Sequence, residues 1–487
     1  DFSTAYRPPA RALWPPPGTG KTTTLILRIA QKRNWEELSE DEKEAFPHEQ
    51  YRAYFHPSNW VMFSPTELLR LYLKEAFSLQ GVAASDDRVR TWTDHRRHLG
   101  RDVLGVLRSV NGGRFTLQED RKTIVDERAD ALVRWHDDFD QFFRQYTVER
   151  YQQHLEILAT AQDPALNEIP GILRERTATE LTWDRLFSLL ELHPSIQAQS
   201  SRLSTQVEGH FRGLIRSFVD PSGRFLDELA IFVASLKTEQ RADEEETDDA
   251  EPETDEPRRA TLSDPRQAAI RALRDAFYSK ARSLRSGNAL SSSSRPRAIW
   301  EWLGARAPAE AMLVPLGTDL QFLRAVNFLR ATHLNLVRGV VGAYQRFRRL
   351  RHKEGRHYAP DAHDALERAV LGGHELDLVL LVMLRHAGRL LEAARRSRID
   401  LSRYAVLAVV RGEYVTQVVV DEATDFSPLQ LACMLELTEP AFRSMFVCGD
   451  VRQRITNWGI RSIEQLRWVA ADFEMREIGV GYRQSRR

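Results

Sequence analysis

The sequence contains only two cysteines, Cys433 and Cys448, among 487 residues. Two thiols are too few for a disulfide framework or a cysteine-rich metal site, and they favour a reducing setting. Both lie in apolar segments, so we expect them to fill a core. No apolar run approaches the roughly 18 residues of a membrane helix, and the first residues lack the pattern of a signal peptide. These absences predict a cytoplasmic globular protein without a membrane partner.

The formal net charge is zero, because 69 basic residues balance 69 acidic ones. The balance hides a segregation: residues 243–256, DEEETDDAEPETDE, hold ten acidic residues and no basic one, which leaves 59 acidic residues elsewhere. The moderately basic remainder is compatible with a nucleic-acid partner. Residues 239–262 are highly charged and nearly devoid of large apolar side chains, so we expect a disordered linker there.

Apolar periodicity divides the chain into three zones. Residues 1–110 alternate strand and helix patterns: NWVMFSP (59–65) predicts a buried strand, and TELLRLYLKEAF (66–77) predicts a helix. Residues 111–400 are mainly helical by pattern. Residues 401–487 return to alternation, with YVTQVVVDEATD and SMFVCGD each predicting a buried strand with a polar end. We therefore expect an α/β fold, with one parallel-sheet domain built from both chain ends and a large α-helical domain inserted between them.

The stretch PPPGTGKT (15–22) fits the phosphate-binding pattern G-x-x-x-x-G-K-[ST] at every position except the first, where proline replaces glycine. Gly18 and Gly20 allow the backbone N–H groups on either side of Thr19 to turn toward phosphate oxygens. The helix that follows, KTTTLILRIAQK, adds its positive N-terminal end.

Within this loop, Lys21 would reach the β- and γ-phosphates of ATP, and the hydroxyl of Thr22 would bind Mg²⁺, with Thr23 beside it. Pro15 has no N–H and fixes its own backbone angle, so the loop must begin differently from the usual pattern. The alternative is a degenerate loop that no longer binds nucleotide.

Two acids, Asp421 and Glu422, directly follow the apolar run VVV. At the tip of a strand, the first acid can hold Mg²⁺ and the second can orient or deprotonate an attacking water. The alternative is an ordinary helix start, because acids also stabilise helix N-termini.

At these residues the chain resembles superfamily 1 helicases of the UvrD/Rep type. VVVDEATDFSPLQL resembles their motif II, FVCGDVRQRITNW motif III and GVGYRQSRR motif IV. VMFSPTELLRLYL and VRTWTD resemble motif Ia and the neighbouring DNA-contact motif, and the former is also similar to the HelD branch, which acts on RNA polymerase. The resemblance covers residues 1–110 and 401–487 and implies a RecA-like P-loop NTPase lobe.

By position, the resemblance implies further nucleotide contacts. Gln453 would sense the γ-phosphate, Arg483 would contact it, and Tyr482 would stack on adenine. Thr424 stands where the family has glutamine, so coupling between ATP and the DNA groove is expected to differ. The family's adenine-reading glutamine is not evident before the phosphate loop, which leaves the choice of nucleotide open.

The resemblance also implies contacts with a nucleic-acid strand at Phe63, Thr91, Trp92 and Trp458. Trp458 falls where the family has an aromatic side chain that stacks on a base of single-stranded DNA, an interaction worth about 1–3 kcal/mol per base. Core packing is the alternative for each aromatic side chain.

The resemblance predicts an ATP-dependent single-stranded DNA translocase or helicase that uses Mg²⁺, with RNA as the alternative polymer. The family continues beyond motif IV with a second RecA-like lobe, so we expect this chain to be the N-terminal portion of a motor. The alternative is a nucleotide-gated interaction protein whose helical insert holds a protein partner such as RNA polymerase or a nuclease subunit.

Overall fold

The computed structural model describes residues 11–14, 21–32, 36, 40, 43, 59–110, 112–175, 181–216, 224–236, 264–291, 294–440, 443–449 and 456–477. The chain divides into two compact units, residues 1–146 with 336–487 and residues 147–335. The helical unit is therefore narrower than the insertion expected at 111–400, because residues at both ends of that zone belong to the unit with the sheet. The linker expected at 239–262 lies outside the described residues.

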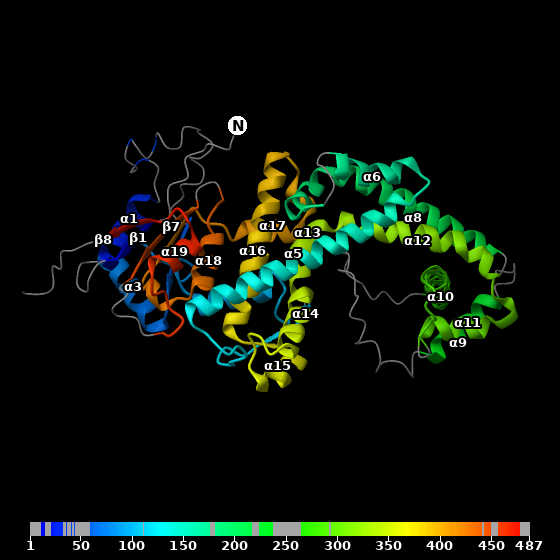
Figure 1. Ribbon diagram of the computed structural model, residues 1–487, viewed down its shortest axis with the longest axis horizontal. Coiled ribbons are helices and arrows are strands. Elements are labelled where there is room, and N and C mark those ends of the chain that lie inside the picture. Colours follow the sequence, from blue (N-terminus) through cyan, green and yellow to red (C-terminus); the bar gives the residue numbers. More distant parts are fainter. Residues whose placement is uncertain are drawn as a thin grey trace, which may run out of the picture. The chain divides into compact units, whose positions relative to one another are not determined.

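The first unit contains a parallel sheet (Figure 1), with its strands in the order β3-β2-β6-β7-β1-β8. All of its pairings are parallel. The sheet contains strands from both ends of the chain, as the sequence predicted. The strands are β1 (Arg11–Trp14), β2 (Trp60–Ser64), β3 (Val89–Thr91), β6 (Gln417–Val420), β7 (Ser444–Cys448) and β8 (Glu474–Glu477). A separate pair, β4 (Thr116–Leu117) and β5 (Val370–Leu371), is also parallel.

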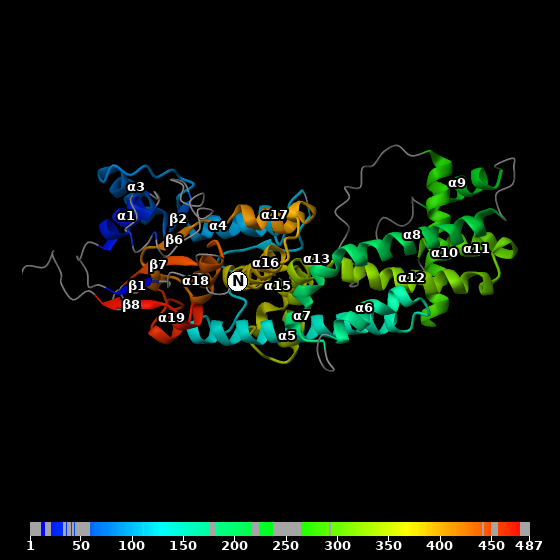
Figure 2. The ribbon, with the colours of Figure 1, turned by 90° about the horizontal axis from the view of Figure 1, so that it is seen from above.

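Helices flank this sheet, so the unit is of the α/β type. In Figures 1 and 2, α1 and α3 lie on one side of the strands and α18 lies on the other. The helices of this unit are α1 (Lys21–Lys32), α3 (Glu67–Leu79), α4 (Trp92–His98), α14 (Gly339–Lys353), α15 (His363–Glu367), α16 (Gly373–Arg396), α17 (Ala405–Gly412), α18 (Pro428–Glu436) and α19 (Ile463–Val469). Two helices contain residues of both units, α5 (Ala129–Ala159) and α13 (Thr332–Val337).

The core between the sheet and the two helices α1 and α3 follows from strand alternation. Met62, Val419 and Phe446 point to the same face, since successive strand residues face opposite ways, and they pack with Leu73 and Phe77 of α3. The strand and helix predicted at 59–65 and 66–77 are confirmed. Within α3, Leu73 and Phe77 are buried and lie on one face of the helix because they are four residues apart, whereas Leu68 is exposed.

The second unit is built from helices around a core of its own. In it α8 lies alongside α12, and α10 packs on α12 (Figure 2). Gly317 of α12 makes the close approach to α10 feasible, because a Cβ atom there would lie 2.6 Å from the carbonyl oxygen of Ala281. Its helices are α6 (Pro164–Glu175), α7 (Trp183–Leu186), α8 (His193–Arg216), α9 (Arg224–Leu236), α10 (Pro265–Ser286), α11 (Arg295–Leu303) and α12 (Glu310–Arg330).

Two expectations about composition can be compared directly with the structure. Cys433 and Cys448 are both buried and unbridged, as their apolar neighbourhoods predicted. Across the described part of the chain, no helix combines the length and the apolar character needed to cross a membrane.

Candidate functional site

The beginning of α1 and the acidic end of β6 meet at the carboxyl edge of the sheet. The first helix, α1, begins at Lys21, and β6 ends at Val420, one residue before Asp421. The Thr22 hydroxyl donates a hydrogen bond to Asp421 Oδ2 over 3.3 Å, although the two residues are 399 positions apart in sequence. Asp421 is only 6% exposed, and its backbone N–H donates to the carbonyl oxygen of Phe63 at the end of β2.

The loop after Asp421 has an unusual backbone. Glu422 adopts the left-handed conformation, with φ 48° and ψ 48°. For a residue with a side chain this conformation costs on the order of 1–3 kcal/mol, and such residues cluster at functional sites. A short 3₁₀ turn, Ala423–Asp425, follows and is buried at its first two residues.

The end of β7 packs closely against this turn. A Cβ atom at Gly449 would lie 3.0 Å from both the backbone nitrogen and the methyl carbon of Thr424. A larger residue at position 449 would therefore push the two loops apart. Because Gly449 belongs to the stretch that resembles motif III and Thr424 to the one that resembles motif II, these two sequence motifs are in contact.

The oxygen atoms of Thr22 and Asp421 fit a magnesium ion bound together with a nucleotide. Mg²⁺ prefers oxygen ligands, and proteins usually hold it through one or two side chains while phosphates and waters supply the rest. A metal site made by protein alone would need more ligands. Within the described residues, no group of three or more His, Cys, Asp or Glu side chains is arranged to hold a metal ion.

The other predicted nucleotide contacts lie in or near the phosphate-loop stretch and toward the end of the sequence. Lys21 is the first residue of α1, but its side chain lies outside the described part, and Thr23 is exposed on the same helix. The remaining predicted contacts lie outside the described residues: Gly18, Thr19, Gly20, Gln453, Tyr482 and Arg483.

Two of the aromatic residues predicted to contact a nucleic-acid strand are buried. Phe63 is 0% and Trp92 is 2% exposed, and their rings meet edge to face with centroids 5.6 Å apart. Thr91 caps α4, since its hydroxyl oxygen accepts a hydrogen bond from the Asp94 N–H. The burial of both rings fits core packing, the alternative that the sequence left open.

Trp458 is in a different environment, because it is partly exposed and lines a cavity of about 530 Å³ in the first unit. Its ring meets that of His374 edge to face, with centroids 5.2 Å apart. Burial lowers the pKa of His374 to about 4, so this imidazole is neutral near pH 7. The other lining residues include four basic and four acidic ones, among them Arg96, Arg97 and Glu119. The cavity is thus lined by an aromatic ring and by charged groups of both signs.

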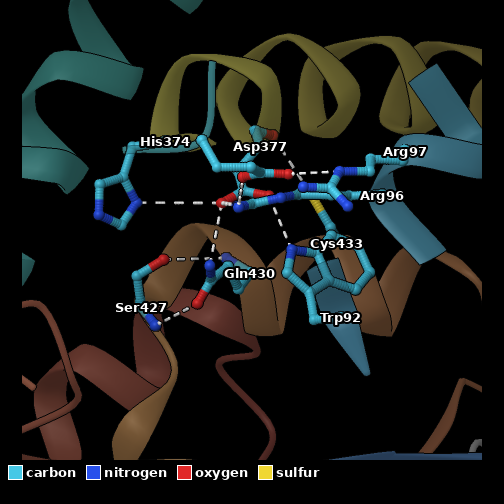
Figure 3. A network of polar contacts seen from close by, with 9 residues as sticks. Trp92, Arg96, Arg97, His374, Asp377, Ser427, Gln430 and Cys433 are labelled. Carbon is cyan, nitrogen blue, oxygen red and sulfur yellow. Dashed lines mark hydrogen bonds and ion pairs between the residues drawn. The ribbon is translucent and has the colours of Figure 1, made fainter. Parts of the chain in front are cut away.

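A buried polar cluster that the sequence interpretation missed is shown in Figure 3, and two of its members, Arg96 and Gln430, also line the cavity. The carboxylate of Asp377 in α16 accepts hydrogen bonds from Trp92 Nε1 at 2.7 Å, Arg96 Nη1 at 2.9 Å and Gln430 Nε2 at 3.1 Å. We call these four residues the Asp377 network. Burial raises the pKa of Asp377, and the positive charge of Arg96 opposes that rise. The sequence held one signal of this cluster: Asp377 lies inside the apolar run of GHELDLVLL, and an acid that is buried needs hydrogen-bond partners.

No known family model matches this chain, and no curated protein is significantly similar to it in sequence.

Proposed function

We propose that the sheet-containing unit binds ATP with Mg²⁺ and hydrolyses it. One observation carries this proposal: the hydroxyl of Thr22 and the carboxylate of Asp421 lie within hydrogen-bond distance at the carboxyl edge of the sheet. Open parallel sheets place their ligands at that edge, between two neighbouring strands whose onward connections lead to opposite sides of the sheet. Here those strands are β1 and β7, because the chain continues from β1 toward β2 on one side and from β7 to β8 on the other.

The residues of the site take complementary roles in this proposal. Lys21 neutralises phosphate charge, and Thr22 and Asp421 hold the metal, which supplies charge stabilisation to the phosphates. Glu422 orients the attacking water and accepts its proton. Its left-handed backbone supports this role, since the backbone strain lies at the residue whose carboxylate has to point toward the water. Gln453, Tyr482 and Arg483 complete the nucleotide contacts.

We further propose that the energy of hydrolysis moves the protein along single-stranded DNA, as in the helicases that it resembles. The cavity beside Trp458 supports this part of the proposal. A partly exposed aromatic ring stacks on bases of any sequence, and arginine side chains bind phosphates. RNA remains the alternative polymer.

The test is ATP hydrolysis by the full chain with and without oligodeoxythymidine. We expect hydrolysis that DNA stimulates, and a loss of at least about 100-fold in Lys21→Ala and in Glu422→Gln, comparable to removing a catalytic group in other enzymes. The control is Glu75→Gln, an exposed glutamate of α3, which we expect to behave as the unchanged protein. Equal activity in all three variants would reject the assignment of the site.

A second candidate function is nucleotide-gated binding of a protein partner such as RNA polymerase or a nuclease subunit. The observation that favours it is the helical unit of residues 147–335, which has its own core and whose described residues contribute no strand to the sheet. Capture of one stoichiometric protein by the full chain, in the presence of ATP and in the absence of DNA, would favour this function over translocation.

A further inference from the structure

Gln430 connects the loop of the nucleotide site to the Asp377 network. Its Oε1 accepts the Ser427 N–H at 3.0 Å, and its own N–H donates to Ser427 Oγ at 3.2 Å, which together form a capping box at the start of α18. Only residues 423–426 separate this cap, which begins at Ser427, from Asp421 and Glu422. At the same time Gln430 Nε2 donates to Asp377. The position of Gln430 therefore sets where the loop of the nucleotide site ends.

Arg96 connects the same network to the cavity. Its Nη1 donates to Asp377 and its Nη2 donates to Glu119, which also accepts a hydrogen bond from Arg97 Nε at 2.9 Å. Arg96, Arg97 and Glu119 line the cavity, and so does Gln430 itself. A Cβ atom at position 373 would lie 2.7 Å from Arg96 Nη2, so a side chain larger than that of Gly373 would displace the guanidinium. The guanidinium of Arg96 thus lies between a buried carboxylate and a carboxylate at the cavity wall.

We propose that the Asp377 network couples the cavity to the nucleotide site, so that single-stranded nucleic acid in the cavity changes the affinity for ATP, with Gln430 as the positioning residue. This inference rests on the proposed function. It goes further by assigning the coupling to named side chains, of which Arg96 and Asp377 lie outside the stretches that resemble helicase motifs, while Gln430 lies within the one that resembles motif II.

The physical reason is competition for the arginines. A phosphate in the cavity competes with Glu119 for Arg96 and Arg97. A movement of Arg96 changes the charge that faces Asp377, and a buried carboxylate has to keep its donors because an unsatisfied charge in the interior is costly. Gln430 then follows Asp377 and shifts the cap at the end of the Asp421–Glu422 loop. Coupling of this kind is reciprocal between the two ligands.

The test is calorimetric titration of ATP with Mg²⁺ into the full chain, with and without saturating oligodeoxythymidine. We expect the dissociation constant for ATP to change by about fivefold or more, within the usual range of coupling between sites. Absence of ATP binding would overturn the proposed function and this inference together. Binding of both ligands without any mutual effect would overturn the inference alone.

Gln430→Glu is the most informative variant. A glutamate can still accept the Ser427 N–H, as in the common Ser-x-x-Glu capping box, but it cannot donate to Asp377. We expect both ligands to bind with the mutual effect lost. The matched control is Gln465→Glu, because Gln465 also donates its backbone N–H to a capping serine, Ser462, accepts a backbone N–H at Oε1, here that of Arg461, and donates Nε2 to an aspartate, Asp130. This control should keep the mutual effect. Retention of the effect in Gln430→Glu, or its loss in both variants, would overturn the inference.

The double variant Asp377→Asn with Gln430→Glu guards against a simple loss of folding. It restores a donor and an acceptor between the two positions with the direction of the hydrogen bond reversed. We expect Asp377→Asn alone to lose the mutual effect and the double variant to regain it. A folded double variant that binds both ligands independently would contradict the role of this contact.

Discussion

Trp92 and Trp458 are the two tryptophans at which the resemblance to helicases implies contact with a nucleic-acid strand. The indole of Trp92 is 2% exposed and donates a hydrogen bond to a buried carboxylate. The ring of Trp458 is partly exposed at the wall of a cavity. The two side chains therefore differ in what their removal would change, stability in the first case and binding in the second.

We predict that Trp458→Ala weakens binding of oligodeoxythymidine by about 1–3 kcal/mol for each base that stacks on the ring. Trp92→Phe should leave that affinity unchanged and lower the free energy of unfolding by about 1.5–3 kcal/mol, because it removes a hydrogen bond to a charged group. Fluorescence anisotropy of a labelled oligonucleotide and urea denaturation measure the two effects. The opposite assignment, with Trp92→Phe impairing binding at unchanged stability, would show that the ring reaches the strand.

Individual residues also show where sequence interpretation succeeds and where it ends. The proximity of Thr22 and Asp421 was predictable, because each is part of a recognisable motif and parallel strands bring their carboxyl ends to one edge. The role of Asp377 was not predictable. Its partner Trp92 lies 285 positions away, and no local pattern records which of many polar residues a buried acid will meet.

At the scale of elements, short periodic segments were predicted well and the boundary of the helical unit was not. Strands β2, β6 and β7 coincide with apolar runs that end at polar residues. The boundary at residue 146 falls within α5, a continuous amphipathic helix of 31 residues. Composition and period do not change there, so the sequence carries no signal of the division.

The packing of α10 on α12 depends on the small size of Gly317. We predict that Gly317→Ala lowers the free energy of unfolding by about 1–3 kcal/mol, because the new methyl group overlaps the Ala281 carbonyl oxygen and forces the helices apart. Gly213→Ala in α8 is the matched control, since nothing lies within 4 Å of the added atom.

That control should be neutral or stabilise the helix by about 0.5–1 kcal/mol, because alanine is the better helix former. Urea denaturation of the full chain, followed by the helical circular dichroism signal, measures both variants. Equal stability of the two would show that α10 and α12 do not approach each other as closely as described.

At the scale of the whole molecule, buried neutral histidines make stability depend on pH. His386 is 3% exposed, and its Nδ1–H donates to the Leu336 carbonyl oxygen at 2.9 Å. Burial lowers its pKa from 6.5 to about 4, and burial lowers the pKa of His95 to about 3. The unfolded chain therefore takes up protons at a higher pH than the folded chain does. The contribution of these histidines to the free energy of unfolding is complete above pH 6.5 and is lost as the pH falls toward 4.

We predict that this loss amounts to about 1.4 kcal/mol per pH unit for each such histidine below its unfolded pKa. His386→Gln should flatten the dependence, since the amide does not titrate and can still donate to Leu336. The control His363→Gln replaces an exposed histidine and should leave the slope unchanged. Thermal unfolding across this pH range measures the effect, and an equal slope in His386→Gln would contradict the account.

The most direct measurement is the binding of ATP to the full chain by calorimetry, with Mg²⁺ and with a chelator, in the unchanged protein, in Thr22→Ala and in Thr22→Ser. If Thr22 and Asp421 hold the metal of the bound nucleotide, binding requires Mg²⁺. Thr22→Ala should then weaken it by about tenfold or more, as expected for the loss of a metal contact, whereas Thr22→Ser retains it. Binding that is indifferent to Mg²⁺ and to the hydroxyl at position 22, or no binding by the unchanged chain, would contradict the assignment of this edge of the sheet as a nucleotide site.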